Sequence, residues 1–523
     1  MNKHSKLLRS TGIISLATFG SRILGLLRDS LIGTFLPAGF NDAFVTAFRI
    51  PSTLRELFAE GALSAAFVPT FTEVNHNKGR EEADKLAGSV FRLLFFVVLG
   101  VCSLGILLAP VVVRILLMGR TGNTDFNIFP VTTILLRVMF PYLLLISLAA
   151  VNMGLLHSIR RFGIPACSPI LLNISIILCL LMGVYYWKYT GQPLAICLAI
   201  GVLIGGSLQL LSQWILAIKL GYLRNIFGPL WHPETGQILK LMVPRIMGFA
   251  TTQLSMFLNT IFASFLWTGS IFVLWSANRL FQFPLGVAGI ALSTATFPQL
   301  ASDVVSGDYK TFHNTLRHSL RTMFAIMLPA AVGLIIIGLP LVDIIFNRGE
   351  FKEQGLLKPT YFALVGYTIG LVGHSGAKLV ASAFFALKDT LTPVKVSISS
   401  LFVNAIVCII AMQYLGPSGL ALGTSVGALF NFTLLCILLK KKTSEEFLRD
   451  LSVYRIFISV IFMAIGIGLL VWFVPWPGGS EIQAIYRIIV GLISGLIIYI
   501  LALRFFLPEE YFLLKEIVVK SRK

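Results

Sequence analysis

Residues 21–69 read SRILGLLRDSLIGTFLPAGFNDAFVTAFRIPSTLRELFAEGALSAAFVP, and the rest of the chain is best understood from this stretch outward. It is apolar enough to form two membrane-spanning helices, yet eight ionisable side chains interrupt it. An Arg or Asp at the middle of a bilayer costs about 2.5–3.5 kcal/mol, so charges in such helices need a paired or wet environment. The stretch therefore predicts a polar site inside a membrane.

The composition extends the membrane prediction to the whole chain. Hydrophobic residues make up 56% of the 523 positions, and charged residues make up 12%. Apolar runs of about 20 residues, the length at which a helix crosses the hydrocarbon core, recur from one end to the other. These runs lack the alternation that is typical of barrel strands. The predicted fold class is therefore an all-α polytopic membrane protein.

Charged and Gly- or Pro-rich breaks divide the chain into about fourteen predicted spans. The spans lie near 11–36, 44–71, 88–118, 131–157, 165–187, 194–218, 237–266, 270–300, 316–346, 359–387, 393–414, 418–439, 452–474 and 482–506. Basic residues gather in one alternate set of connections, whereas the other set holds few, Arg120 among them. Because Lys and Arg collect in cytoplasmic loops, both termini are predicted to be cytoplasmic. The same rule explains the net charge of +19 without nucleic acid.

The sequence also resembles itself at an offset of about 230 residues, which is a signal to seek in any transporter-like chain. AEGALSAAFVP (59–69) matches AGIALSTATFP (288–298), and AFR (47–49) matches ANR (277–279). Several ordered matches near one offset predict an internal repeat.

The repeat predicts two lobes of six helices in parallel orientation, residues 1–220 and 230–442. Two additional helices lie outside the repeat, within residues 450–508, and residues 509–523 form a cytoplasmic tail. In this arrangement Arg279 in the second lobe is the repeat mate of Arg49 in the first.

Charges within the first two spans are spaced at helical intervals. Arg22 and Asp29 are two turns apart, as are Asp42 and Arg49, so each pair shares one helix stripe. Arg49 also comes just before Pro51, and a proline inside a span removes a backbone hydrogen bond. Broken helices beside charges are a recurring way to build a transport site near the midplane.

Cations contributed by both lobes predict an anionic substrate, and guanidinium groups suit phosphate better than a lysine does. For Arg28, Arg55 and Arg279 a substrate role is favoured over structural ion pairs. For Arg49 and Asp42, a structural pair and a ligand role are equally well supported. Lys378 could line the same cavity. The chain has no phosphate-binding loop or hydrolase motif, so neither ATP hydrolysis nor a cofactor is predicted.

Long ordered stretches resemble the MurJ (MviN-type) lipid II flippases of bacterial peptidoglycan synthesis. They are SRILGLLRD (21–29), DAFVTAFRIPSTLRELFAEGALSAAFVP (42–69), FPYLLLISLA (140–149), RFGIPACSPILLNISII (161–177), NTIFASFL (259–266), ANRLFQFPLGVAGIAL (277–292) and LTPVKV (391–396). The resemblance implies the fold of the multidrug/oligosaccharidyl-lipid/polysaccharide exporter superfamily. It also implies that the two additional helices form a groove for the lipid tail.

The resemblance further implies roles for individual residues. Arg28, Arg55 and Arg279 match cavity arginines that hold the lipid II diphosphate, and Arg22 matches another functionally required arginine. The supporting charges are Asp29, Asp42, Arg49, Glu60 and Lys378. Many members carry acids where this chain has Asn278 and Gln282. No acid accompanies Asn259, Asn404 and Thr424, so no sodium site is predicted.

The sequence thus predicts a monomeric flippase in the bacterial cytoplasmic membrane, which moves lipid II to the outer leaflet by alternating access. Two alternatives stay open at this point. One is a related exporter of other lipid-linked oligosaccharides or of drugs, although a drug pump would favour acidic cavity residues. The other is a non-transporting scaffold in which the arginines are structural pairs.

Overall fold

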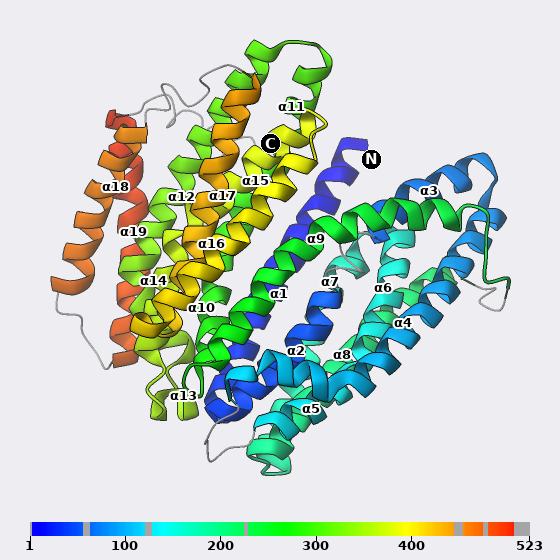
Figure 1. The fold of residues 1–523 in the computed structure, drawn as a ribbon, viewed down its shortest axis with the longest axis horizontal. Helices are drawn as coiled ribbons and strands as arrows, with labels where there is room; N and C mark the ends of the chain where they lie inside the picture. Colours follow the sequence, from blue (N-terminus) through cyan, green and yellow to red (C-terminus); the bar gives the residue numbers. More distant parts are fainter. Residues whose placement is uncertain are drawn as a thin grey trace. The chain divides into compact units, whose positions relative to one another are not determined.

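The computed structural model describes residues 3–55, 63–120, 128–223, 228–443, 453–473 and 480–506 (Figure 1). These residues form helices joined by short connections, and none of them forms a strand. The predicted all-α fold class is therefore confirmed. The helices pack into two compact units, Met1–Phe272 with Arg348–Phe351 and Val273–Asn347 with Lys352–Lys523.

The first unit holds nine α-helices and two short helical turns, and α10 begins at its end. They are α1 (Lys3–Phe35), α2 (Ala38–Arg55), α3 (Ser64–Asn77), α4 (Arg80–Leu116), η2 (Met118–Arg120), α5 (Ile128–Met139), α6 (Pro141–Ser158), α7 (Gly163–Leu181), η3 (Met182–Tyr186), α8 (Gly191–Lys219) and α9 (Thr235–Ser264). Helix α7 packs against α1 and α8, and α9 packs against α3 and α4.

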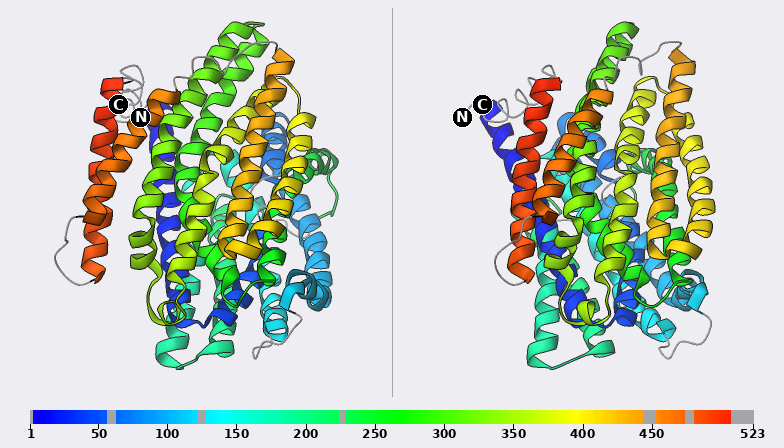
Figure 2. Two further views of the ribbon diagram at one scale, coloured as in Figure 1. Left: turned by 60° about the vertical axis from the view of Figure 1, so that its left-hand side comes forward. Right: turned by 90° about the vertical axis from the view of Figure 1, so that its left-hand side faces the viewer.

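The second unit holds the remaining elements, except that Arg348–Phe351, which includes the first three residues of α13, belongs to the first unit. They are α10 (Ser270–Pro284), η4 (Leu285–Gly289), α11 (Ile290–Val305), α12 (Tyr309–Phe346), α13 (Gly349–Glu353), α14 (Leu357–Ile369), α15 (Leu371–Ala386), α16 (Leu391–Leu415), α17 (Pro417–Thr443), α18 (Val453–Gly468), η5 (Leu469–Phe473) and α19 (Ser480–Phe506). Helices α18 and α19, orange and red in Figure 2, pack together and against α12. The Tyr499 hydroxyl donates a hydrogen bond to the Ala325 carbonyl oxygen, 2.6 Å away, where these helices meet.

Ten helical segments among the described residues are long and apolar enough to cross a membrane. Each corresponds to one of the predicted spans. The four predicted spans that do not meet this measure are 11–36, 44–71, 237–266 and 270–300. They are the first two spans of each predicted lobe, and they contain the candidate arginines. The total of fourteen spans stays a prediction, and so does the repeat boundary between residues 220 and 230.

Two connections, one in each unit, have the same backbone conformation at positions that the repeat matches. Arg160 follows α6 and Lys388 follows α15, and both have a φ of 59°. The N–H of Arg161 donates to the Leu156 carbonyl, and the N–H of Asp389 donates to the Phe384 carbonyl. Each pattern is a Schellman ending, in which a left-handed residue closes a helix. A basic residue occupies a position that glycine would fill with less strain.

Asp389 also fixes the start of α16, and this gives a prediction for acid stability. Its carboxylate accepts hydrogen bonds from the Thr392 N–H and hydroxyl and pairs with Lys442 at 2.5 Å. The Lys442 ammonium and the Thr392 N–H lower the pKa of Asp389 from 3.8 to about 2. Because the folded pKa is the lower one, this stabilisation is complete above about pH 4 and is lost as the pH falls to about 2.

Replacing Asp389 by asparagine should therefore lower the free energy of unfolding by about 1 kcal/mol at pH 7, as expected for a cap with a partly exposed ion pair. Thermal unfolding in detergent at a series of pH values would measure this. The wild-type and variant melting temperatures should converge as the pH approaches 2. A difference that is the same at pH 7 and pH 2.5 would show that the carboxylate charge contributes nothing.

Candidate functional site

Arg28 lies in the interior of the first unit and is held there by two helices. Its guanidinium donates from Nε and Nη2 to Asp29 Oδ1, at 2.9 and 2.6 Å, and from Nη1 to Asn173 Oδ1 at 3.0 Å. Arg28 is 3% exposed and Asp29 1%. The guanidinium also lies 5.7 Å from the centre of the Phe48 ring. The structure thus brings together two predicted site residues as a buried ion pair.

Asn173 of α7 contacts α1 at Ser21 and at Arg28, which lie about two helical turns apart. Its amide nitrogen donates to the Ser21 carbonyl at 3.1 Å, while its oxygen accepts from Arg28. Gly25 lies beside this amide, and a Cβ there would be in ordinary van der Waals contact with both amide atoms at 3.9 Å. Arg22 follows Ser21 directly on the same helix and is half-buried.

Asp42 forms a second polar cluster in the first unit. Its Oδ2 accepts from Arg120 Nη2 at 2.9 Å and from the Gly269 N–H at 2.7 Å, and its Oδ1 accepts from the Phe272 N–H at 2.9 Å. The carboxylate is fully buried and Arg120 is 8% exposed. A negative charge at the start of a helix is favourable because the first N–H groups lack partners there. Asp42 therefore caps α10.

The structure tests one of the two interpretations that the sequence left open for Arg49, the structural pair with Asp42. Asp42 pairs with Arg120 rather than with Arg49, which reaches α9 instead. Arg49 Nη1 donates to the Met256 carbonyl at 3.2 Å and to the Thr260 hydroxyl. The Arg49 guanidinium thus joins α2 to α9 through hydrogen bonds to a backbone carbonyl and a hydroxyl of α9. The structure thus contains no Asp42–Arg49 pair, and a ligand role for Arg49 stays a prediction.

The remaining predicted residues lie in different places. Arg55 is the last residue of α2 and is half-buried, whereas Glu60 falls outside the described residues. Arg279 lies on α10 in the second unit, with its guanidinium carbon 4.7 Å from the centre of the Trp275 ring. Lys378 is exposed on α15.

Two residues of these clusters were not predicted as site residues. Arg120 follows α4 and resembles an ordinary loop cation in the sequence, and Asn173 resembles a polar residue of a packed helix. No local pattern marks either, because their partners are 78 and 145 residues away. A charged residue within an apolar span does predict that some partner exists, and that signal was available for Asp42 and Arg28.

The helical fold, with ionised groups buried between helices, defines a polytopic membrane protein of the transporter class. The structure resembles the inward-facing conformation of a multidrug resistance MATE family transporter of the MOP superfamily, with a TM-score of 0.69. That likeness covers 81% of this chain and 94% of the other, at 16% sequence identity, and it concerns the fold alone.

The family follows from closer comparisons. The family model described as lipid II flippase MurJ matches residues 34–487. A probable lipid II flippase MurJ from Vibrio cholerae is 34% identical over 439 residues, 82% of each chain. The lipid II flippase MurJ of Burkholderia cenocepacia is 34% identical over 83% of this chain and 84% of that one. A solved lipid II flippase MurJ, in an inward closed conformation, matches 94% of this chain and 98% of that one with a TM-score of 0.75 and 27% identity. The chain belongs to the MurJ family, as its sequence motifs predict.

Proposed function

We propose that this protein moves lipid II, the undecaprenyl-diphosphate-linked peptidoglycan precursor, from the cytoplasmic to the outer leaflet of the membrane. The observation that carries this proposal is the match to the lipid II flippase model over residues 34–487, together with 34% identity to relatives of that name. The protein is accordingly a transporter in cell-wall synthesis and not an ATP-hydrolysing enzyme.

The candidate arginines differ in how they could contact a diphosphate. Arg22, Arg55 and Arg279 are half-buried, so part of each side chain is accessible to a ligand. Arg28 is buried, and Asp29 and Asn173 take three of its five N–H donors. We assign Arg55 and Arg279 to direct binding of the diphosphate, with Arg22 as a further contact. Arg28, Asp29 and Asn173 hold the helix that carries Arg22.

Alternating access between the two units would carry the head group across the membrane while the polyprenyl tail stays in lipid. The substrate can drive such a change only through the difference between its affinities for the two conformations. A membrane potential of 100 mV adds about 2.3 kcal/mol for each charge moved, which is enough to bias the cycle. The protein would act as a monomer in the bacterial cytoplasmic membrane with both termini in the cytoplasm.

Reconstitution tests the proposal directly. The purified full chain is placed in vesicles that contain labelled lipid II, and a membrane-impermeant reagent measures how much label reaches the other leaflet. Exchange should exceed that of protein-free vesicles and of vesicles with an unrelated membrane protein. Exchange of another lipid-linked oligosaccharide but not of lipid II would favour the exporter alternative. Exchange of neither would contradict the proposed function.

A further inference from the structure

One side of α10 carries four polar or aromatic side chains in a single row, Trp275, Asn278, Arg279 and Gln282. At about 100° of rotation per residue, they lie within about 100° of the helix circumference. Trp275, Asn278 and Arg279 are half-buried, and Gln282 is exposed. All four residues belong to the second unit. We call them the α10 row.

The opposite side of α10 packs against other helices of the second unit. Leu274, Leu280 and Phe281 are buried on that side. The Phe281 ring centre lies 5.7 Å from that of Tyr367 on α14 and 5.4 Å from that of His374 on α15. The packing of α10 thus rests on its apolar side, which holds the α10 row in a fixed orientation within the second unit.

Trp275 orients the guanidinium of Arg279. The guanidinium carbon lies 4.7 Å from the ring centre, and a cation within about 6 Å of an aromatic ring centre is attracted to the ring face. The two residues are four apart and so are neighbours on the helix surface. Arg28 is oriented instead by Asp29 and Asn173, which take three of its N–H donors. A ring needs no such donor, so this contact leaves the planar fork of Arg279 able to bind phosphate oxygens.

Asn278 and Gln282 form an amide pair beside Arg279. Gln282 Nε2 donates a hydrogen bond to Asn278 Oδ1. The pair then still offers the Nδ2 donor of Asn278 and the Oε1 acceptor of Gln282. Within the described part of the chain, neither amide has another hydrogen-bond partner. The α10 row therefore presents a cation together with a neutral donor and a neutral acceptor.

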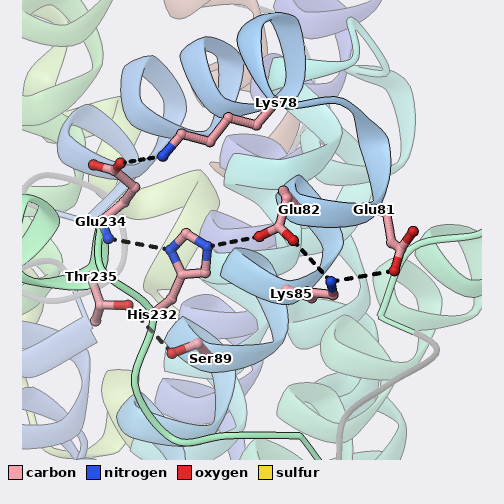
Figure 3. A network of polar contacts seen from close by, with 8 residues as sticks. All are labelled: Lys78, Glu81, Glu82, Lys85, Ser89, His232, Glu234 and Thr235. Atoms are coloured by element: carbon pink, nitrogen blue, oxygen red, sulfur yellow. Dashed lines mark hydrogen bonds and ion pairs between the residues drawn. The ribbon is translucent and has the colours of Figure 1, made fainter.

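The network at the connection between α8 and α9 shows the other arrangement, in which polar groups serve as partners for one another (Figure 3). Lys78 Nζ pairs with Glu234 Oε1 at 2.8 Å, and the Glu234 N–H donates to His232 Nδ1 at 3.2 Å. His232 Nε2 lies 3.4 Å from Glu82 Oε2, and Lys85 Nζ pairs with Glu82 Oε1 at 2.8 Å. Those contacts attach the connection to the α3–α4 hairpin, whereas the amide pair of α10 attaches that helix to no other described element.

We infer that the α10 row recognises the sugar that carries the diphosphate of lipid II. Arg279 binds a phosphate, and the amides of Asn278 and Gln282 bind hydroxyl or amide groups of the adjoining sugar. A sugar hydroxyl both donates and accepts, so a neutral donor and acceptor suit it, whereas a second cation would suit another phosphate. Trp275 is a positioning residue that acts through Arg279. This inference rests on the proposed function and assigns part of its substrate specificity.

Binding of two lipids to the full chain in detergent tests the inference. The probes are lipid II and undecaprenyl diphosphate, which has the diphosphate and the polyprenyl chain but no sugar. Asn278→Ala combined with Gln282→Ala should raise the Kd for lipid II about tenfold, as expected for the loss of two hydrogen bonds. The Kd for undecaprenyl diphosphate should stay within about twofold of the wild-type value. Arg279→Ala, by contrast, should weaken the binding of both lipids.

Asn314→Ala combined with Gln413→Ala is the matched control, because it removes two exposed amides of the same unit outside α10. Its Kd values for both lipids should equal those of the wild type. Thermal unfolding of each variant shows whether the protein is folded. An amide pair that only stabilised α10 would lower the melting temperature and leave the preference for lipid II over undecaprenyl diphosphate unchanged, and that result would overturn the inference.

The role of Trp275 is tested by two substitutions that keep an apolar side chain. Trp275→Leu should weaken the binding of both lipids about threefold, because the guanidinium of Arg279 loses its ring. Trp275→Phe should restore most of the affinity, since a ring face is again present. Equal affinities for the two variants would contradict the positioning role.

The same measurements separate failure of this inference from failure of the proposed function. If the variant that lacks both amides bound both lipids as tightly as the wild type, the α10 row would not recognise the sugar. If it lost affinity for both lipids equally, Asn278 and Gln282 would act on the diphosphate. Either result would overturn the inference while the wild type still bound and exchanged lipid II. A wild type that neither bound nor exchanged lipid II would overturn the proposed function itself.

Discussion

Lipid II exchange is expected to fall about 100-fold when Arg279 is replaced by alanine, which corresponds to about 2.7 kcal/mol of lost binding to the diphosphate. Arg279 is half-buried and lies over the Trp275 ring, so its truncation should cost less stability than that of a fully buried, paired charge. The melting temperature should therefore stay near that of the wild type. Vesicle exchange and thermal unfolding, measured on the same preparation, check both expectations.

Arg279→Lys is the matched control because it keeps the charge and removes the planar fork. We expect its rate of lipid II exchange to lie between the rates of the wild type and of Arg279→Ala, since a lysine binds phosphate as a point charge. If Arg279→Ala exchanged lipid II as fast as the wild type, the assignment of Arg279 to diphosphate binding would be wrong. Arg28→Ala is a poorer test, because it would leave the Asp29 carboxylate buried and could cost about 3–5 kcal/mol of stability.

Replacing Asp42 by alanine should lower the free energy of unfolding by about 3–5 kcal/mol, because it leaves the Arg120 charge buried without its acid. The same change removes the acceptor for the Gly269 and Phe272 N–H groups at the start of α10. Thermal unfolding in detergent would show a lower melting temperature. A variant as stable as the wild type would mean that the cap and the ion pair contribute little.

Two double-mutant cycles identify the partner of Asp42. Asp42→Ala with Arg120→Ala should destabilise less than the sum of the single changes, because the two groups share one interaction. Asp42→Ala with Arg49→Ala should be close to additive, since Arg49 contacts α9. The opposite pattern would assign Asp42 to Arg49, which the sequence spacing alone allows.

The fold class could be predicted because it depends on local features. Apolar runs of membrane length and the polarity of the first two helices of each lobe are visible along the sequence. Arg28 and Asp29 were both predicted as site residues, but the sequence favoured a substrate role for Arg28 over the ion pair with Asp29 that the structure contains. The helical ends at Arg160 and Lys388, by contrast, carry no glycine that would mark them.

The partners of the buried charges could not be predicted because the fold alone brings them together. Asp42 meets Arg120 after 78 residues and Gly269 after 227. Seven-residue spacing made Arg49 an apparent partner, but two turns of helix place the side chains about 10 Å apart along the axis. The polar attachments of α9 were also missed, because the repeat assigns that helix to the other lobe.

The Asp42 cap has a consequence for how the protein is made. The carboxylate leaves the ribosome 230 residues before Phe272, the residue whose N–H it accepts. At 5–20 residues per second, this interval is about 10–50 s. Arg120, the ion-pair partner, follows Asp42 after 78 residues, whereas the N–H groups of Gly269 and Phe272 follow only after 227 and 230 residues. The polar cluster around Asp42 is therefore completed only when the eighth predicted span emerges.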